Sequence, residues 1–329
     1  MPTLIRAKTG IYHIVSTVNG KRVWRTTGTR IQSQAYEVFL KQTKPDGKLI
    51  SECFVEVEPF VKANLSKSTS EIYDFTIKSL IRIIGDLPVN RVTHMLIEKY
   101  KVERIKEVKA ETVNQAVRTI KAFFNILKRW KIIGENPCDG VKEMRIQEKI
   151  PVYLTEDELK KLIDCINDKW LKEIVIFAAM TGARLGEVLN VMWDDLDFAR
   201  KTVLIRSSAV YHIKSGKVRV VPLNETVIRM LEHKRDREGL VFKGKRGGHA
   251  QDNHVSRSFR MAARVAKMKA GVHFHTLRHT FASLLVKKGV SLYQVQRLLG
   301  HSSPRVTEVY AHLQNSEMHD VVEKLDLNI

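Results

Sequence analysis

Residues 275–313 read "HTLRHTFASLLVKKGVSLYQVQRLLGHSSPRVTEVYAHL" and hold reactive polar side chains at places where a helical core does not need them. Apolar residues at helical spacing predict a helix that Gly289 ends, with a buried face formed by Leu277, Phe281, Leu284 and Leu285. This spacing places His275 and Arg278 in the first turn of the helix.

The rest of this stretch predicts two shorter helices. Ser291 caps one that ends at Gly300, and His301 then begins a turn. The following "SSP" starts a second helix, which is expected to carry Tyr310. A tyrosine therefore follows two histidines and an arginine closely in the chain.

These residue types suit the binding of a phosphodiester. The N–H groups at the start of a helix favour an anion, and the guanidinium of Arg278 is a bidentate donor for a phosphate. A tyrosine phenol, with a pKa near 10, is a poor nucleophile at neutral pH. Arg278, His275 and His301 can supply the help that it needs, by stabilising a phenolate and the charge on phosphorus together.

Each residue also has an ordinary structural explanation when it is taken alone. His275 can cap its helix, Arg278 can form a surface salt bridge, and Tyr310 can be a packed aromatic side chain. The chemical interpretation depends on the whole set.

An upstream motif, "TGARLGEVLNVMWDDLDF" at residues 181–198, adds more positive charge. Arg184 can point away from the apolar face formed by Leu185, Val188, Leu189 and Met192. Glu187 is placed to be its i,i+3 ion partner. Further along, Lys214 precedes a Ser-Gly turn between two predicted strands, where it can be a solvated lysine or donate a proton to a leaving hydroxyl.

The composition indicates a basic, globular chain. The 329 residues predict two or three domains, and 56 Lys plus Arg against 36 Asp plus Glu give a net charge of +20 and a pI near 9.8. Nucleic acid is the expected partner, and its affinity should fall as salt rises. A generically basic protein or a membrane-surface binder is a weaker alternative, because no basic amphipathic helix dominates and the basic residues are spread along the whole chain.

No signal pattern or long apolar run is found in the sequence, so a cytoplasmic protein without a membrane partner is expected. The three cysteines (Cys53, Cys138 and Cys165) fit neither a disulfide framework nor a CxxC metal site. We expect them to be buried or incidental thiols.

Three domains are expected along the chain. Residues 1–50 carry nine Lys/Arg against two Asp/Glu. They predict two strands around "NGKR" and a helix from Ser33. This segment is either a DNA-binding module or an extension that aids solubility. Residues 51–145 predict a helical bundle, and residues 142–151 read as a linker. Residues 151–329 predict helices that flank two strands at residues 202–223. The expected fold is mixed α/β and mostly α, with a small antiparallel sheet in the last domain.

Local signals set the expected helix starts. "STSE" at residues 68–71 and "TEDE" at residues 155–158 are capping boxes, and Pro59 predicts a kink or a later start in the first helix of the bundle. In a later helix, residues at helical spacing predict a core-facing stripe, formed by Val113, Val117, Ile120, Phe124 and Leu127.

Four elements in order, "ARLGEVLNVMWDDLDF", "HIKSGKVRVVPL", "HTLRHTFAS" and "LLGHSSPRVTEVYAHL", resemble the tyrosine recombinase (phage integrase) family across the whole C-terminal half. The resemblance makes this half the catalytic domain and the helical bundle a core-binding domain. Residues 1–50 look like the arm-binding domain of lambda-type integrases. The family resemblance implies that the protein is a phage or genomic-island integrase, which carries out site-specific DNA recombination and needs no cofactor and no metal.

The resemblance also implies a role for each matching residue. Arg184 and Arg278 would hold the non-bridging oxygens of the scissile phosphate, with His275 and His301 hydrogen-bonding beside them. Tyr310 would attack phosphorus to form a 3′-phosphotyrosyl link. Lys214 would be the general acid, although Lys217 lies on the same hairpin. His275 is a candidate proton acceptor, and two residues form a supporting shell, Glu187 and His279.

The implied partners are double-stranded DNA at core and arm sites, a homo-tetramer on that DNA, and DNA-bending and directionality factors. An apolar strip in the tail can pack on its own domain or on a neighbouring subunit, through Val321, Val322, Leu325 and Leu327. The acidic run of Asp194, Asp195 and Asp197 is interpreted as helix-end and turn residues.

Other functions are also compatible with these motifs. A chromosome-dimer resolvase, a transposon-borne recombinase or a type IB topoisomerase would share the chemistry, and a non-catalytic DNA-binding regulator would share the fold. The basic N-terminal module favours an integrase. A metal-dependent nuclease would use His275, His279, His301 and His312, but Arg278 would repel the cation and there is no HExxH glutamate.

Overall fold

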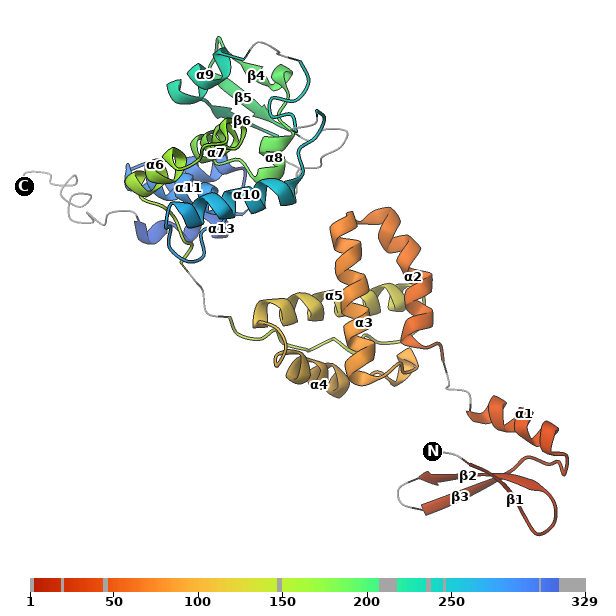
Figure 1. The fold of residues 1–329 in the computed structure, drawn as a ribbon. Helices are drawn as coiled ribbons and strands as arrows, with labels where there is room; N and C mark the ends of the chain where they lie inside the picture. Colours follow the sequence, from red (N-terminus) through yellow and green to blue (C-terminus); the bar gives the residue numbers. More distant parts are fainter. Residues whose placement is uncertain are drawn as a thin grey trace, which may run out of the picture. The chain divides into compact units, whose positions relative to one another are not determined.

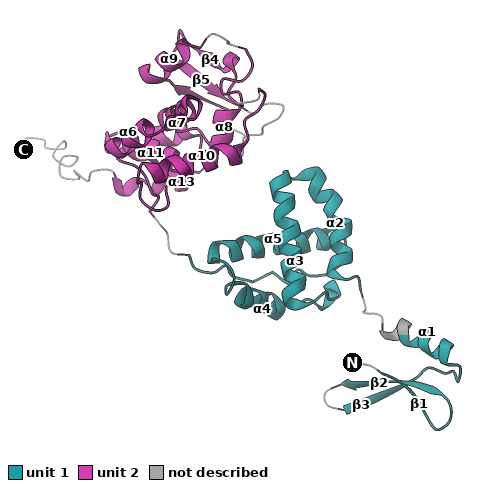
Figure 2. Cartoon of the chain, viewed as in Figure 1, with its two compact units in different colours: residues 1–148 teal, residues 149–329 magenta. Residues whose placement is uncertain are grey.

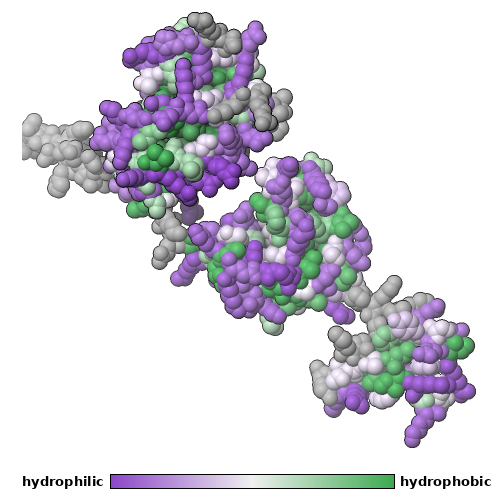
Figure 3. All heavy atoms as spheres, in the orientation of Figure 1, coloured by the Kyte–Doolittle hydropathy of each residue, from purple (hydrophilic) through white to green (hydrophobic). Residues whose placement is uncertain are grey.

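The computed structural model describes residues 3–18, 21–43, 47–146, 150–206, 218–234, 238–244, 247–301 and 303–313. Lys214, Lys217, the turn beside them and the apolar strip of the tail lie outside the described residues. The chain divides into two compact units, Met1–Glu148 and Lys149–Ile329 (Figure 2). In Figure 3, hydrophilic side chains cover most of the visible face of the second unit.

The N-terminal part of the first unit is a three-stranded antiparallel sheet with one helix. Its elements, in red and orange in Figure 1, are β1 Thr3–Arg6, β2 Tyr12–Val18, β3 Lys21–Thr26 and α1 Gln32–Thr43. The sequence predicts two strands, and the structure corrects this by adding β1 at the edge of the sheet. Few side chains are buried here, at Ile14, Val15 and Ala35, and every residue of β3 is exposed. The small apolar core predicted from the sequence is confirmed.

The remainder of the first unit is a helical bundle. Its elements are α2 Ile50–Asn64, α3 Lys67–Ile84, η1 Val89–Arg91, α4 His94–Arg104 and α5 Ala110–Arg129. The predicted stripe of α5 is fully buried, at Val113, Val117, Ile120, Phe124 and Leu127. Cys53 and Cys138 are buried in the same core, where desolvation raises the pKa of their thiols to about 11 and about 12.

Two predicted details of this bundle differ from the structure. Helix α3 begins at Lys67, one residue before the proposed capping box, because Ser66 is the N-cap and its hydroxyl accepts the N–H of Thr69 at 3.3 Å. Helix α2 starts at Ile50 and continues through Pro59. The proline is tolerated because it lies on the exposed side of the helix with Val55, whose carbonyl loses its intrahelical donor but can meet water there.

The second unit is mainly helical and carries one small antiparallel sheet of order β4-β5-β6. Its elements are α6 Glu156–Asp164, α7 Lys169–Thr181, α8 Leu185–Leu189, η2 Trp193–Asp195, β4 Leu196–Asp197, β5 Thr202–Ile205, β6 Arg219–Pro222, α9 Glu225–Glu232, α10 Asp252–Val265, α11 Thr276–Lys287, α12 Leu292–Leu299, α13 Arg305–Glu308 and η3 Ala311–Leu313. The predicted caps at Thr155 and Ser291 are both confirmed by their hydrogen bonds.

The largest core lies around α7, most of whose central residues are buried and which packs against α11. A smaller cluster forms where α11, α12 and the last helical turns meet, and it contains Ala282, Val286, Val295, Leu299 and Tyr310. None of the described helices is both long and apolar enough to cross a bilayer.

Gly182 makes the sharp turn that separates α7 from α8. Its φ is +65°, and a Cβ atom at this position would lie 2.5 Å from Phe281 Cδ1 and 2.8 Å from Leu299 Cδ2. Because these side chains belong to α11 and α12, a glycine at residue 182 lets α7, α11 and α12 approach one another closely.

We therefore expect Gly182→Ala to destabilise the second unit by about 3 kcal/mol, through left-handed backbone strain and overpacking together. Gly289→Ala is the matched control, because Gly289 has a φ of +82° and a Cβ atom added there would have no neighbour within 4 Å. That variant should lose about 1 kcal/mol, from strain alone. Denaturant unfolding of the full chain compares the two, and equal losses would show that Phe281 and Leu299 move aside easily.

Candidate active site

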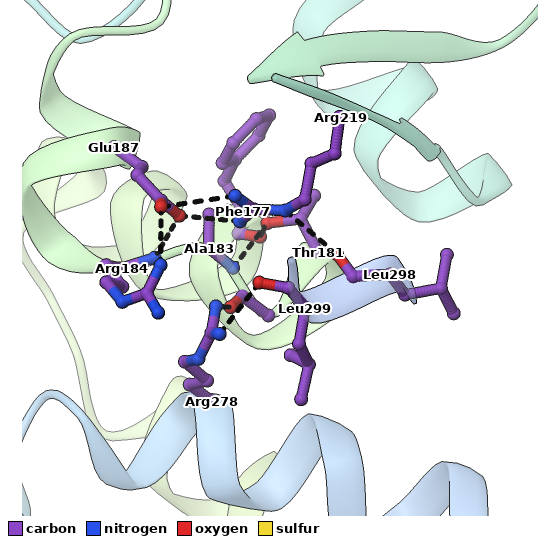
Figure 4. Close-up of polar contacts among 10 residues, drawn as sticks. Phe177, Thr181, Ala183, Arg184, Glu187, Arg219, Arg278, Leu298 and Leu299 are labelled. Atoms are coloured by element: carbon purple, nitrogen blue, oxygen red, sulfur yellow. Dashed lines mark hydrogen bonds and ion pairs between the residues drawn. The ribbon is translucent and has the colours of Figure 1, made fainter. Parts of the chain in front are cut away.

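Arg278 lies in the first turn of α11, as predicted, and is 2 % exposed. Its Nη1 donates to the carbonyl of Gly182 and its Nη2 to the carbonyl of Leu299, both at 2.8 Å (Figure 4). Leu299 is the last residue of α12, and Gly182 caps the C-terminus of α7, so both carbonyls belong to the electronegative ends of helices. Arg278 is thus fixed by the same turns that bring these helices together.

A second arginine, Arg184, stands at the start of α8 and is held by Glu187. The carboxylate of Glu187 accepts the backbone N–H of Arg184 at 2.8 Å and its Nη1 at 2.8 Å. The side chain of Arg184 keeps 24 % of its surface exposed, whereas that of Glu187 has none. The i,i+3 pairing predicted from the sequence is confirmed, and it leaves part of the Arg184 side chain exposed.

The same carboxylate binds a third arginine that sequence reasoning missed. Arg219 of β6 donates to Glu187 Oε1 at 3.1 Å and to Oε2 at 2.6 Å, as Figure 4 shows. Although desolvation of this buried carboxyl opposes ionisation, the hydrogen bonds and charges of Arg219 and Arg184 outweigh it and lower the pKa of Glu187. Glu187 is therefore an anion between two cations.

His301 follows the left-handed turn at Gly300 and is 9 % exposed. Its Nδ1 lies 2.8 Å from the hydroxyl of Thr307. Desolvation, followed by the charges of Arg278, Arg184 and Arg219, lowers the pKa of His301 to about 3. This imidazole is neutral at physiological pH.

Two further histidines lie one helical turn apart at the start of α11. The rings of His275 and His279 meet edge to face, with centroids 4.9 Å apart. Part of His275 is exposed at the surface. Desolvation of its ring is the main cause that lowers its pKa to about 4, and the charges of His279, Arg278 and Arg184 add to this effect. Desolvation also lowers the pKa of His279 to about 4, so both rings are neutral at pH 7.

Tyr310 is 2 % exposed in the small cluster of α11 and α12. Its phenol lies 2.6 Å from Nδ1 of His279, and desolvation raises its pKa to about 12 although Arg278 opposes the rise. The sequence predicts a helix that carries Tyr310, but α13 ends at Glu308. The tyrosine lies in the next turn, with its N–H bonded to the carbonyl of Thr307.

The structure brings most of the predicted site residues into one unit and one charge network. The charges of Arg184 and Arg278 act on both His275 and His301, and Tyr310 acts on Arg278. Lys214 lies outside the described residues. Asp195 ends η2 and pairs with Arg206 at 2.5 Å, which confirms a structural role for this part of the acidic run.

The metal-nuclease alternative gains no support from the part of the chain that the structure describes. Within it, no group of three or more His, Cys, Asp or Glu side chains is arranged to hold a metal ion. The two histidines of α11 are four residues apart, but Nδ1 of His279 is occupied by the phenol of Tyr310.

Low pH should destabilise the second unit through His301. A histidine in the unfolded chain has a pKa of 6.5, whereas the folded His301 binds a proton only near pH 3. Between these pH values the unfolded chain binds more protons, so stability is lost as pH falls from 6.5 towards 3. We expect His301 to contribute a loss of about 2 kcal/mol between pH 6.5 and 5. Denaturant unfolding at both pH values should show a weaker pH dependence for His301→Gln than for the wild type. Equal pH dependence would contradict the lowered pKa.

The sequence and the fold match known proteins over most of the chain. The Phage integrase family matches residues 152–317, and the phage integrase N-terminal domain matches residues 63–145. A tyrosine recombinase of Thermosipho africanus (strain TCF52B) is 31% identical over 273 residues, which cover 79% of this chain and 94% of that protein. The tyrosine recombinase XerC of Oceanobacillus iheyensis is 27% identical over 84% of this chain and 95% of its own length.

Among solved structures, a lambda integrase dimer bound to a COC' core site has a TM-score of 0.68 at 19% identity, over 96% of this chain and 95% of that one. This likeness concerns the fold alone. The fold and the matches together define a site-specific DNA recombinase. The chain belongs to the tyrosine recombinase (phage integrase) family.

Proposed function

We propose that this recombinase is an integrase that inserts or excises mobile DNA of a phage or genomic island, with Tyr310 as its nucleophile. One observation carries the proposal: Tyr310 shares a single unit and a single charge network with Arg278, Arg184, His275 and His301. The basic N-terminal module supports the integrase role. Its exposed strand β3 offers Lys21, Arg22 and Arg25 to a polyanion.

In the cleavage step, the phenolic oxygen of Tyr310 attacks phosphorus and the bond from phosphorus to the 5′ oxygen breaks. The phenol proton passes to His275, and Lys214 gives a proton to the departing 5′ oxygen. The products are a 3′-phosphotyrosyl link and a free 5′-hydroxyl. Attack by the 5′-hydroxyl of another strand reverses the step and rejoins the DNA, so the protein needs neither a metal nor a cofactor for energy.

The transition state carries more negative charge than the bound phosphodiester. Arg184 and Arg278 would hold its non-bridging oxygens, where a preorganised cation stabilises charge as it develops. When Thr307 donates to Nδ1 of His301, the remaining proton of that neutral ring sits on Nε2 and can be donated to phosphate. Glu187 would orient Arg184 and His279 would orient Tyr310, each through a hydrogen bond.

The same proposal covers domains and partners. Residues 1–50 would bind arm sites, residues 51–145 would bind core sites, and residues 151–329 would catalyse. The active assembly would be a homo-tetramer on two DNA duplexes in the cytoplasm of a bacterial host, aided by DNA-bending and directionality factors. The DNA complex of lambda integrase supports the DNA partner.

A chromosome-dimer resolvase, which would share the chemistry, is the second candidate; the match to a protein named tyrosine recombinase XerC covers 95% of that relative. Both candidates share the chemistry and differ in the use of residues 1–50. An integrase needs this module for recombination, so deletion of residues 1–48 should abolish recombination between attachment sites while adduct formation on core DNA persists. Full recombination by the shortened chain would favour the resolvase.

The first test of the chemistry is a covalent-adduct assay. The chain is incubated with a supercoiled plasmid library of random inserts in EDTA, quenched with SDS, and the DNA that remains attached to protein is captured and sequenced. Peptide mapping of the adduct should place the nucleotide on Tyr310. A mapped tyrosine elsewhere would identify the wrong nucleophile here, and binding without any adduct would favour the non-catalytic regulator.

A further inference from the structure

Arg219 connects three parts of the candidate site that are distant in sequence. It lies on the edge strand β6, its side chain is 5 % exposed, and it makes a bidentate ion pair with Glu187. Its Nε donates to the carbonyl of Leu298 at 2.9 Å, one residue before the end of α12. In Figure 4, its guanidinium reaches from the strand to the opposite side of the carboxylate from Arg184.

The turn that precedes His301 is shaped around this arginine. Gly300 has a φ of +66°, and a Cβ atom there would lie 2.8 Å from Cδ of Arg219. The missing side chain gives the guanidinium room to reach both Leu298 and Glu187. Arg219 is therefore built into the site, in contrast to the many solvated basic residues of this chain.

The charges of the cluster show what Arg219 contributes. Arg184, Arg219 and Arg278 supply three positive charges and the ionised Glu187 supplies one negative charge, so these four side chains sum to +2. A phosphodiester carries one negative charge, and its five-coordinate transition state carries two. Without Arg219, Glu187 would neutralise Arg184 and the sum would fall to +1.

We propose that Arg219 is a positioning residue that neutralises Glu187 and so leaves the positive charge of Arg184 available to the scissile phosphate. This role rests on the proposed chemistry at Tyr310. It explains why the buried carboxylate of Glu187 can lie beside Arg184, the arginine proposed to bind phosphate. Glu187 still orients Arg184, through two hydrogen bonds, while Arg219 carries the counter-charge.

The test compares adduct formation on a core duplex recovered from the adduct assay with the same duplex that carries a neutral methylphosphonate at the scissile position. Arg219→Gln should slow adduct formation on the phosphodiester on the order of 100-fold, the effect of losing one electrostatic contribution to the transition state. The loss on methylphosphonate should be much smaller, because that centre lacks one negative charge. A purely structural defect would slow both reactions alike.

Two variants separate charge from geometry. Arg219→Lys keeps the charge but loses the bidentate fork, so its ratio of phosphodiester to methylphosphonate rates should stay near that of the wild type. Glu187→Gln combined with Arg219→Gln restores the sum of +2 and should react faster with the phosphodiester than Arg219→Gln alone. Arg206→Gln removes a charge from the separate ion pair with Asp195 and should leave the ratio unchanged.

Binding of inorganic phosphate to the free protein provides a readout that needs no cleavage. Its affinity should fall in Arg219→Gln and recover in the double variant. Equal losses on both DNA substrates, or a double variant that binds phosphate no better than Arg219→Gln, would overturn the role of Arg219. A wild type that forms no adduct would instead overturn the chemistry of Tyr310, and the phosphate titration would still decide the role of Arg219.

Discussion

Tyr310→Phe is expected to form covalent adducts with DNA at least about 10⁴-fold more slowly than the wild type, so that no adduct is detected. Removal of the attacking atom of an enzyme nucleophile has effects of this size or larger. The substitution removes a single oxygen, and the ring still fills the cluster beside Leu299. Folding should lose about 1 kcal/mol with the hydrogen bond to His279. The measurement is SDS-stable attachment of end-labelled DNA in EDTA.

The control for Tyr310→Phe is DNA affinity. The phenol is 2 % exposed, so the variant should bind the same duplex as tightly as the wild type and with the same dependence on salt. Tyr293, which is 67 % exposed on α12, provides the matched substitution: Tyr293→Phe should form adducts normally. Adducts of Tyr310→Phe at the wild-type rate would show that another residue attacks phosphorus.

Arg278→Ala is expected to slow adduct formation on the order of 10³-fold, the upper range for loss of one transition-state donor. Both the charge and the two hydrogen bonds to the carbonyls of Gly182 and Leu299 disappear in this variant. Single-turnover kinetics on the recovered core duplex measure the effect. The loss should appear in the rate at saturating protein, because the charge acts mainly on the transition state.

Arg278→Lys separates the charge from the geometry. A lysine keeps the positive charge but cannot span two carbonyls with a planar fork, so its rate should lie between those of Arg278→Ala and the wild type. Thermal unfolding of both variants reports whether the second unit remains folded. A folded Arg278→Ala protein with a rate within tenfold of the wild type would show that the phosphate is held elsewhere.

Local patterns account for the parts of the site that could be predicted. The position of Arg278 follows from one helix start, the Arg184–Glu187 pair from i,i+3 spacing, and the turn before His301 from a single glycine. Each of these features depends on residues within a few positions of one another. The mostly helical fold with a small antiparallel sheet is confirmed for the same reason.

The features that could not be predicted depend on contacts between distant segments. Arg219 and Glu187 are 32 residues apart, and nothing in either local sequence identifies the other as a partner. One signal was available: in "RVVP", Arg219 and Val221 share the buried face of an alternating strand, an unusual place for an arginine without a partner. The contact between His279 and Tyr310 also depends on how α11 meets the turn that follows α13.

The burial of Tyr310 bears on the safety of the host genome. A recombinase meets vastly more unrelated DNA than target DNA, and its many basic residues hold it to any sequence. In the single chain, the phenolic oxygen of Tyr310, the proposed nucleophile, is buried in the cluster of α11 and α12 and hydrogen-bonded to His279. With Tyr310 as the proposed nucleophile, we expect chance encounters with DNA to break no strand until an assembled complex draws Tyr310 out of its cluster.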